Sequence, residues 1–251
     1  MKLRALYALA LGVALALPAL DAPADDLVLY LSFDGDSGDV ALDHSGFGND
    51  ATFFGNPQWT DGVHDGQGLA FDGATWGEVP DDSSLDITGA LTMSVWALVN
   101  PGGEATQSAM EKGSAWKEGE YNLAALYAGG TLLQARDLPA ACADTNVGPS
   151  IQDATWHYLA GTLDGAEIKL YVDGVLSASM ACTGDLLTND DPLYIGARGG
   201  TGRFLNGALD ELRVYDYALS EAQILDDMNN ATPVEARGKM TTAWGSLKAA
   251  R

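Results

Sequence analysis

The stretch WHYLAGTLDGAEIKLYVDGVLSAS, residues 156–179, decides the fold class of this chain. In it, Asp164-Gly165 and Asp173-Gly174 separate three short runs, and in the middle run apolar and polar residues alternate. Asp-Gly supplies the positive φ angles of a type I′ turn, and alternation at every second residue is typical of a strand with one buried face. The stretch therefore predicts an antiparallel meander of three strands.

Similar short runs recur along the chain between Gly, Asn and Asp: LVLYLSF, QGLAFDG, LTMSVWALV, YNLAALY, TLLQA, PLYIGA and LDELRVY. Their lengths and the turn residues between them predict an all-β fold, an antiparallel sandwich of two sheets. One short helix is expected over ALSEAQILDDM, with Ser220 as N-cap and Glu221 in the first turn. The residues expected to pack this helix on the sandwich are Ala222, Ile224 and Leu225.

The two ends of the chain differ in composition from the rest. Lys2 and Arg4 precede an Ala/Leu run over residues 5–19, and Ala22-Pro23-Ala24 has the pattern of a cleavage site. This is the layout of a secretory signal peptide, and the run is shorter than the roughly 20 residues of a membrane span. We therefore expect a signal peptide over 1–24, export to the extracellular space or the periplasm, a sandwich over 25–228, and a basic tail over 229–251. Contact of the tail with the acidic body, contact with another partner, and disorder all remain open.

The net charge limits the kinds of partner that the chain can bind, and the two cysteines predict a disulfide. The formal net charge is −22, so the chain repels nucleic acid and anionic membranes. Cys142 and Cys182 are the two cysteines, and in an exported protein a disulfide between them is expected. It would fasten the irregular stretch DLPAACADTN to SASMACTG.

Four longer motifs give the sequence a family resemblance: residues 29–55 (LYLSFDGDSGDVALDHSGFGNDATFFG), 68–99 (GLAFDGATWGEVPDDSSLDITGALTMSVWALV), 191–199 (DPLYIGARG) and 204–220 (FLNGALDELRVYDYALS). In this order they resemble the laminin-G-like domains of the concanavalin A-like lectin/glucanase superfamily, over about Leu27 to Met228. The resemblance implies a jelly-roll, and commonly a structural calcium ion that joins the first strand, an early loop and a late strand.

The positions that match this calcium site are Asp34, backbone oxygens at Gly48 and Asn49, and Asp210; Asp43 and Asp50 are alternatives in the same loop. Calcium takes 6–8 oxygen ligands, and a carboxylate inside a strand is costly without a cation or a hydrogen-bonding partner. Without the resemblance, Asp210 would be interpreted as paired with Arg213, Arg203 or a backbone amide, or as exposed to solvent.

Residue patterns for catalysis are weak. Glu111, Glu118 and Glu120 are interpreted as solubilising acids of a Gly- and Lys-rich loop, and GxSxG, HExxH and P-loop motifs are missing. Neither acidic stretch, DELRVYD or EKGSAWKEGEY, gives the alternating carboxylates of a glucanase, so an enzyme is not expected.

A binding surface is the favoured interpretation. Trp116, with Arg198 and Arg203, forms the candidate ligand patch, while Trp76 and Phe204 are expected to support the fold. The predicted function is an exported, calcium-stabilised binding or adhesion module for carbohydrate or an extracellular protein. A polysaccharide hydrolase or lyase on the same fold, or a purely structural surface protein, are the alternatives.

Overall fold

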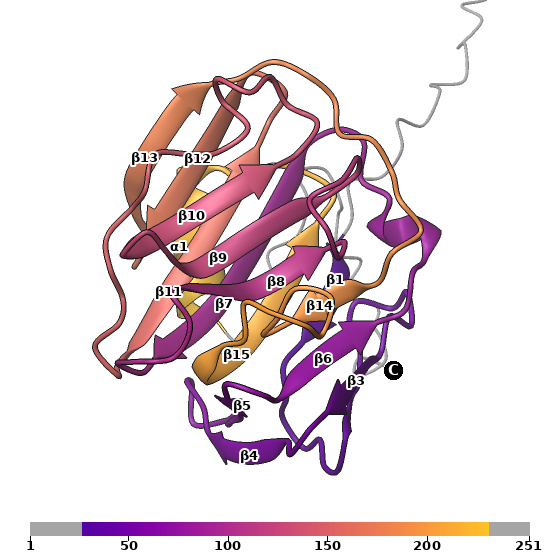
Figure 1. The fold of residues 1–251 in the computed structure, drawn as a ribbon, viewed down its shortest axis with the longest axis vertical. Coiled ribbons are helices and arrows are strands. Elements are labelled where there is room, and N and C mark those ends of the chain that lie inside the picture. Colours follow the sequence, from indigo (N-terminus) through magenta and orange to yellow (C-terminus); the bar gives the residue numbers. More distant parts are fainter. Residues whose placement is uncertain (1–26, 231–251) are drawn as a thin grey trace, which may run out of the picture.

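Alternation of apolar and polar side chains at the start of β7 (Leu91–Val99) explains how this sequence builds two layers. Met93, Val95 and Ala97 are buried in the core between two sheets, while Thr92 and Ser94 face away from it; Thr92 bonds to the segment before the C-terminal helix, and Ser94 bonds to the helix itself. The computed structural model describes residues 27–230. In Figure 1, β8, β9 and β10 cross in front of β7 and β11, and the helix α1 lies behind them.

The larger sheet has eight strands, in the order β13 (Val175–Ala181), β12 (Glu167–Val172), β11 (Trp156–Leu163), β7, β15 (Asn206–Tyr215), β5 (Gln67–Asp72) and β4 (Gln58–Asp61), with β1 (Leu27–Leu31) also paired to β15. The smaller sheet has seven, in the order β10 (Gly130–Ala135), β9 (Tyr121–Tyr127), β8 (Thr106–Lys112), β14 (Leu193–Ile195), β6 (Trp76–Val79), β3 (Ala51–Phe54) and β2 (Val40–Ala41). The 3₁₀ turn η1 spans Ser83–Leu85. The pairs within both sheets are antiparallel, so the predicted jelly-roll sandwich is confirmed.

The predicted meander is β11, β12 and β13, paired in sequence order. Its second turn is of the expected type, because Asp173 and Gly174 have φ angles of 52° and 74°. The type I′ prediction was wrong at the first turn, where Gly165 has a positive φ but Asp164 does not. There the Asp164 carboxylate accepts hydrogen bonds from two following amides, which closes a different turn.

β15 lies inside the larger sheet and pairs with three other strands. β7 pairs along one side of it, while on the other side β5 pairs with residues 206–209 and β1 with residues 212–215. The register shifts between Asp210 and Arg213, and Glu211 has a φ of 53°, so a bulge marks the point where β5 gives way to β1.

The helix α1 (Glu221–Asn229) lies on the outer face of the larger sheet. Ser220 caps it in a reciprocal capping box with Gln223, and Ile224 is buried, as expected. The expectation for Ala222 was wrong, since it is exposed, whereas Leu225 is 45% exposed but lies against Gly174 in the turn between β12 and β13. The helix is also held through Asp227, which is fully buried and accepts hydrogen bonds from the hydroxyl groups of Ser94, Tyr158 and Tyr215.

The predicted disulfide is confirmed. Cys142 and Cys182 are bonded, with their Cα atoms 5.5 Å apart, and the bridge joins the loop after β10 to the end of β13. The expected signal peptide and basic tail lie outside the described residues, apart from the start of the tail at the end of α1. Within residues 27–230, no helix is both long enough and apolar enough to cross a membrane.

Candidate functional site

A row of polar side chains crosses the outer face of the smaller sheet. Gln134 of β10 is opposite Asn122 of β9, Asn122 is opposite Glu111 of β8, and Glu111 is opposite Tyr194 of β14. Neighbouring residues in these strands, such as Leu123, belong to the core, and successive side chains of a strand point to opposite faces. The row therefore faces away from the core, beneath the loops that follow β8 and β14.

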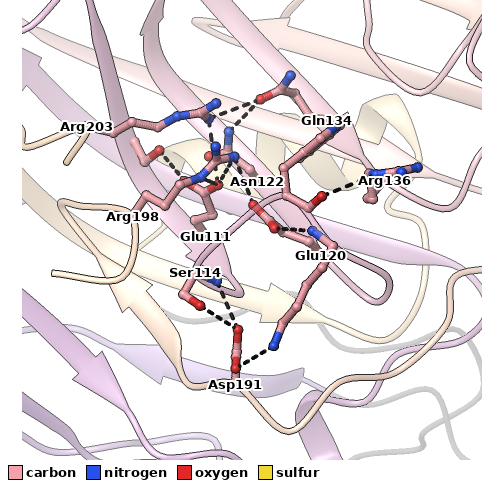
Figure 2. Close-up of polar contacts among 12 residues, drawn as sticks. Glu111, Ser114, Glu120, Asn122, Gln134, Arg136, Asp191, Arg198 and Arg203 are labelled. Carbon is pink, nitrogen blue, oxygen red and sulfur yellow. Dashed lines mark hydrogen bonds and ion pairs between the residues drawn. The ribbon is translucent and has the colours of Figure 1, made fainter. Parts of the chain in front are cut away.

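Two carboxylates are buried in this region. Glu111 and the neighbouring Glu120, which precedes β9, both have side chains that are 0% exposed. Arg198 binds the two together, with its Nε 2.5 Å from Glu111 Oε1 and its Nη2 2.8 Å from Glu120 Oε1 (Figure 2). Burial, together with the hydrogen bond and the charge of Glu111, raises the pKa of Glu120 to about 8. The pair therefore holds a proton near neutral pH, and the interpretation of Glu111 and Glu120 as solubilising acids was wrong.

The three residues of the predicted ligand patch come together above this pair. The Arg198 guanidinium lies 5.8 Å from the centre of the Trp116 ring. Arg203 donates to Gln134 Oε1 at 3.3 Å and lies 3.6 Å from Glu111 Oε1. Both arginine side chains are 18% exposed, and Trp116 is half-buried. We call Trp116, Arg198 and Arg203 the Trp116 patch.

The loop that carries Trp116 is fixed from below. Asp191 accepts hydrogen bonds from the amide and the hydroxyl of Ser114, at 3.1 and 2.8 Å, and its other oxygen lies 2.8 Å from Lys117 Nζ. Arg136 Nε donates to the carbonyl oxygen of Trp116 at 3.3 Å (Figure 2). Trp116 itself has a φ of 54°, a conformation that a non-glycine residue adopts only when its surroundings hold it there.

The residues beneath the patch were not predicted from the sequence. Asn122 and Gln134 stand within the predicted strands YNLAALY and TLLQA, so a polar residue inside an apolar strand was the available signal. Asn122 Oδ1 is buried and has no hydrogen-bond partner among residues 27–230. Such an orphaned acceptor is typical of a functional site or of a place for an ordered water.

Two of the predicted calcium residues, Asp34 and Asp210, lie beside the larger sheet near the bulge of β15, whereas Gly48 and Asn49 lie in the loop between β2 and β3. Asp210 is 1% exposed; its Oδ2 accepts a hydrogen bond from the amide of Val63 at 2.7 Å, and its Oδ1 one from the amide of Glu211 at 2.8 Å. Asp34, directly after β1, accepts from the amide of Gln67 at 2.8 Å. The two carboxylates thus hold one loop, residues 62–67, from both ends. Asp210 has backbone amides as partners and forms no ion pair within residues 27–230.

The surroundings of Asp210 could accommodate a hard cation, because its buried carboxylate has no cationic partner among the described residues. Burial raises the pKa of Asp210 to about 7, and the negative charges of Glu211 and Asp34 add to the effect. Glu211, whose pKa burial also raises to about 7, is paired with the buried Arg213, which leaves Asp210 without a balancing charge. Across the described residues, no group of three or more His, Cys, Asp or Glu side chains could hold a metal ion. A cation here would therefore take most of its ligands from backbone carbonyls, as calcium accepts.

Gly48 and Asn49 belong to a loop that is tied to β1. Asp43 Oδ2 accepts from the amides of both residues, at 3.0 and 2.9 Å, and Asp43 Oδ1 accepts from the amide of Tyr30. The Asn49 side chain donates to the carbonyl of Val28 at 2.8 Å. Asp43, one of the alternative ligands, is therefore engaged in building the loop.

A family model described as "Concanavalin A-like lectin/glucanases superfamily", of the laminin-G type, matches residues 71–225. No curated protein matches the chain. Among solved structures, domain 4 of AbnA, a GH43 extracellular arabinanase from Geobacillus stearothermophilus in complex with arabinotriose, has a TM-score of 0.64 at 21% identity. The match covers 82% of this chain and 99% of that domain.

Toxin binding domains share the fold as well. The binding domain of Paraclostridial Mosquitocidal Protein 1 has a TM-score of 0.60 at 18% identity, over 81% of this chain and 52% of that one. The binding domain of Botulinum Neurotoxin DC in complex with SialylT has a TM-score of 0.61 at 12% identity, over 82% and 52%. This chain thus spans about half the length of the toxin binding domains, and these identities show a common fold alone.

Proposed function

The chain belongs to the concanavalin A-like lectin/glucanases superfamily, and we propose that it is an exported module of that superfamily that binds carbohydrate at the Trp116 patch. The observation that carries the proposal is the geometry of the patch. A half-buried indole and two partly exposed guanidinium groups lie together, and buried carboxylates hold the guanidinium groups in place.

Each part of the patch matches a part of a sugar. The apolar face of a sugar ring packs on an aromatic ring, and guanidinium N–H groups donate to hydroxyl oxygens. Within residues 27–230 the Arg203 side chain contacts Gln134 and Glu111 through one nitrogen, Nη1, and it is 18% exposed, so it can still donate to a ligand. Because the buried carboxylates fix the arginines beforehand, little conformational entropy is lost on binding.

The buried acids also bear on the enzyme alternative. A glycosidase needs two carboxyl groups that reach the scissile bond. Glu111 and Glu120 form the nearest pair in the patch, but both side chains are 0% exposed and both are bound to Arg198. This placement favours a supporting role for them and a binding function for the site.

Similar proteins support the choice of ligand class. Three of the structures that share the fold carry a name that states a bound partner: arabinotriose for the arabinanase domain, SialylT for one toxin domain, and the protein rat synaptotagmin II for another. The proposal of export is supported by the disulfide, which forms and persists in oxidising compartments.

We further propose that calcium binds at the β15 bulge and acts structurally. Asp34 and Asp210 would hold it, with backbone oxygens at Gly48 and Asn49 as the expected partners from the early loop. When bound, the ion supplies positive charge beside a buried carboxylate that has no cationic partner.

Binding to an immobilised panel of neutral and acidic oligosaccharides, arabinotriose among them, tests the carbohydrate proposal. Titration calorimetry on Trp116→Ala and Arg198→Ala should then show at least a tenfold weaker Kd, about 1.4 kcal/mol. Val175→Ala, a 66% exposed residue on β13 of the larger sheet, is the control and should bind normally. A folded Trp116→Ala protein with unchanged affinity would contradict the proposal, and release of reducing ends would restore the enzyme alternative.

A further inference from the structure

Aromatic rings continue from the Trp116 patch across the outer face of the smaller sheet. Phe54 of β3 and Trp76 of β6 stack with their ring centres 4.4 Å apart and their planes 22° apart. Tyr194 of β14 lies next to them, 5.9 Å from Trp76. Phe54 is 39% exposed, which is unusual for a Phe whose plane is fixed by a neighbouring ring. These three residues are the Phe54 cluster.

Strand register places the cluster on the same face as the patch. The row that runs from Gln134 to Glu111 continues through Tyr194 to Glu78 of β6 and Thr52 of β3. From β8, which carries Glu111, to β3 there are three strand intervals. At about 4.8 Å each, these intervals place β3 roughly 14 Å from β8. This distance is longer than one sugar ring.

One loop joins the two ends. The segment between β14 and β15 carries Arg198 and Arg203, and its glycines make close contacts on both sides. A Cβ at Gly200 would lie 2.6 Å from Cζ2 of Trp76, and a Cβ at Gly199 would lie 3.0 Å from Cβ of Ser114. The loop therefore rests on Trp76 on one side and on the Trp116-bearing loop on the other. Glycine is needed here both for space and for φ angles of 57° and 61°.

We infer that the Trp116 patch and the Phe54 cluster are two ends of one extended site for an uncharged polysaccharide chain. The inference rests on the proposed function and specifies its ligand. Trp116, which is half-buried, and Phe54, which is exposed, are more than one sugar ring apart, so only a ligand with several sugars can contact both. The protein carries a net charge of −22, and Glu78 lies within the row itself, so a polyanion is repelled. The hydroxyl groups of a neutral sugar both donate to carboxylates and accept from guanidinium groups.

Calorimetric titration with arabino-, xylo- and cello-oligosaccharides of one, three and six sugars tests the inference. For the oligosaccharide that binds, affinity should rise with length, and Phe54→Ala should weaken the hexasaccharide by tenfold or more without changing a shorter ligand. Trp116→Ala should weaken every length. Phe54 is exposed, so its truncation leaves the core intact, and Val175→Ala serves again as the control on the other sheet.

The outcomes separate the two proposals. If Trp116→Ala abolishes binding and Phe54→Ala changes nothing at any length, the extended site is wrong and the proposed function stands. If no oligosaccharide binds, both fail. Tighter binding of polygalacturonate than of every neutral oligosaccharide would overturn the uncharged class.

Discussion

Replacing Asp210 by Asn should remove the response of the protein to calcium while changing its calcium-free stability little. Without calcium, burial raises the pKa of this carboxyl from 3.8 to about 7, so its ionisation at pH 8 costs about 4 kcal/mol at 1.36 kcal/mol per unit. Asn removes that cost. It also offers one acceptor oxygen where the carboxylate serves two amides, and an unpaired buried amide costs about 1–3 kcal/mol. The two terms offset each other to within a few kcal/mol.

Calcium should then raise the melting temperature of the natural protein but not that of Asp210→Asn. A ligand at a hundred times its Kd stabilises the folded state by about 2.7 kcal/mol. For a domain of this size, each kcal/mol shifts Tm by about 2–4 °C, so the natural protein should melt about 5–11 °C higher in calcium. The assay is a thermal melt at pH 8, in EDTA and in millimolar calcium, with circular dichroism to verify the fold.

Asp227→Asn is the matched control, because Asp227 is equally buried but its charge is balanced by an ion pair with Arg213. It should lower Tm in both buffers and keep the full calcium shift. Superimposable melts of the natural protein in the two buffers would refute the argument for a cation at the bulge. So would an Asp210→Asn protein that retains the whole shift.

Four further results are expected. Replacing Cys142 and Cys182 by Ser should cost about 4 kcal/mol, since the bridge closes a loop over a separation of 40 residues, measurable as a lower urea midpoint; an unchanged midpoint would contradict this. Burial alone would lower the pKa of His157, but its hydrogen bonds to two neighbouring aspartates raise it. Protonated His157 should therefore stabilise the fold fully below pH ~6.5 and progressively less as pH rises through its folded pKa. His157→Gln should accordingly be less stable than the natural protein at acid pH and equally stable at alkaline pH. Because the folded-state pKa of Glu120 is raised from 4.5 to about 8, the natural protein should lose stability relative to Glu120→Gln as pH rises from about 5 to about 8, and the difference should level off above that; parallel pH profiles would count against the shared proton. Gly200→Ala should weaken oligosaccharide binding by displacing the loop from the ring that it contacts, with crystal or NMR data as the check that the fold is kept.

Local patterns predicted the parts of the fold that local physics controls. The strands of the meander follow from alternation and Asp-Gly turns, and the start of α1 follows from Ser220 as a cap. β8 was not predicted, because its sequence TQSAMEK is polar although all but its first residue are buried. Loops cover the outer face of β8, so its polar side chains are buried there. A sequence pattern in which polar residues indicate a solvent-exposed face cannot predict such burial.

The candidate site, too, was predictable from the sequence only in part. Trp116, Arg198 and Arg203 could be selected as polar and aromatic residues of Gly-rich loops, but their assembly depends on Glu111 and Glu120. Whether such acids are solvated or buried is decided by contacts across 78–87 residues of chain, which no local pattern contains. The partner of Asp210 is likewise an amide 147 residues away.

The place of β15 between three other strands has a consequence for how the chain folds. Its partner β1 stands at the opposite end of the described sequence, so Leu31 meets Leu212 only after nearly all of the domain has been synthesised. Until then β7 and β5 each keep an open edge, and closing such long-range pairs is slow because of their high contact order. The chain therefore cannot complete its larger sheet during early synthesis. A shortened chain that ends before residue 206 would leave the edges of β1, β5 and β7 that face β15 unpaired, and such edges are templates for aggregation.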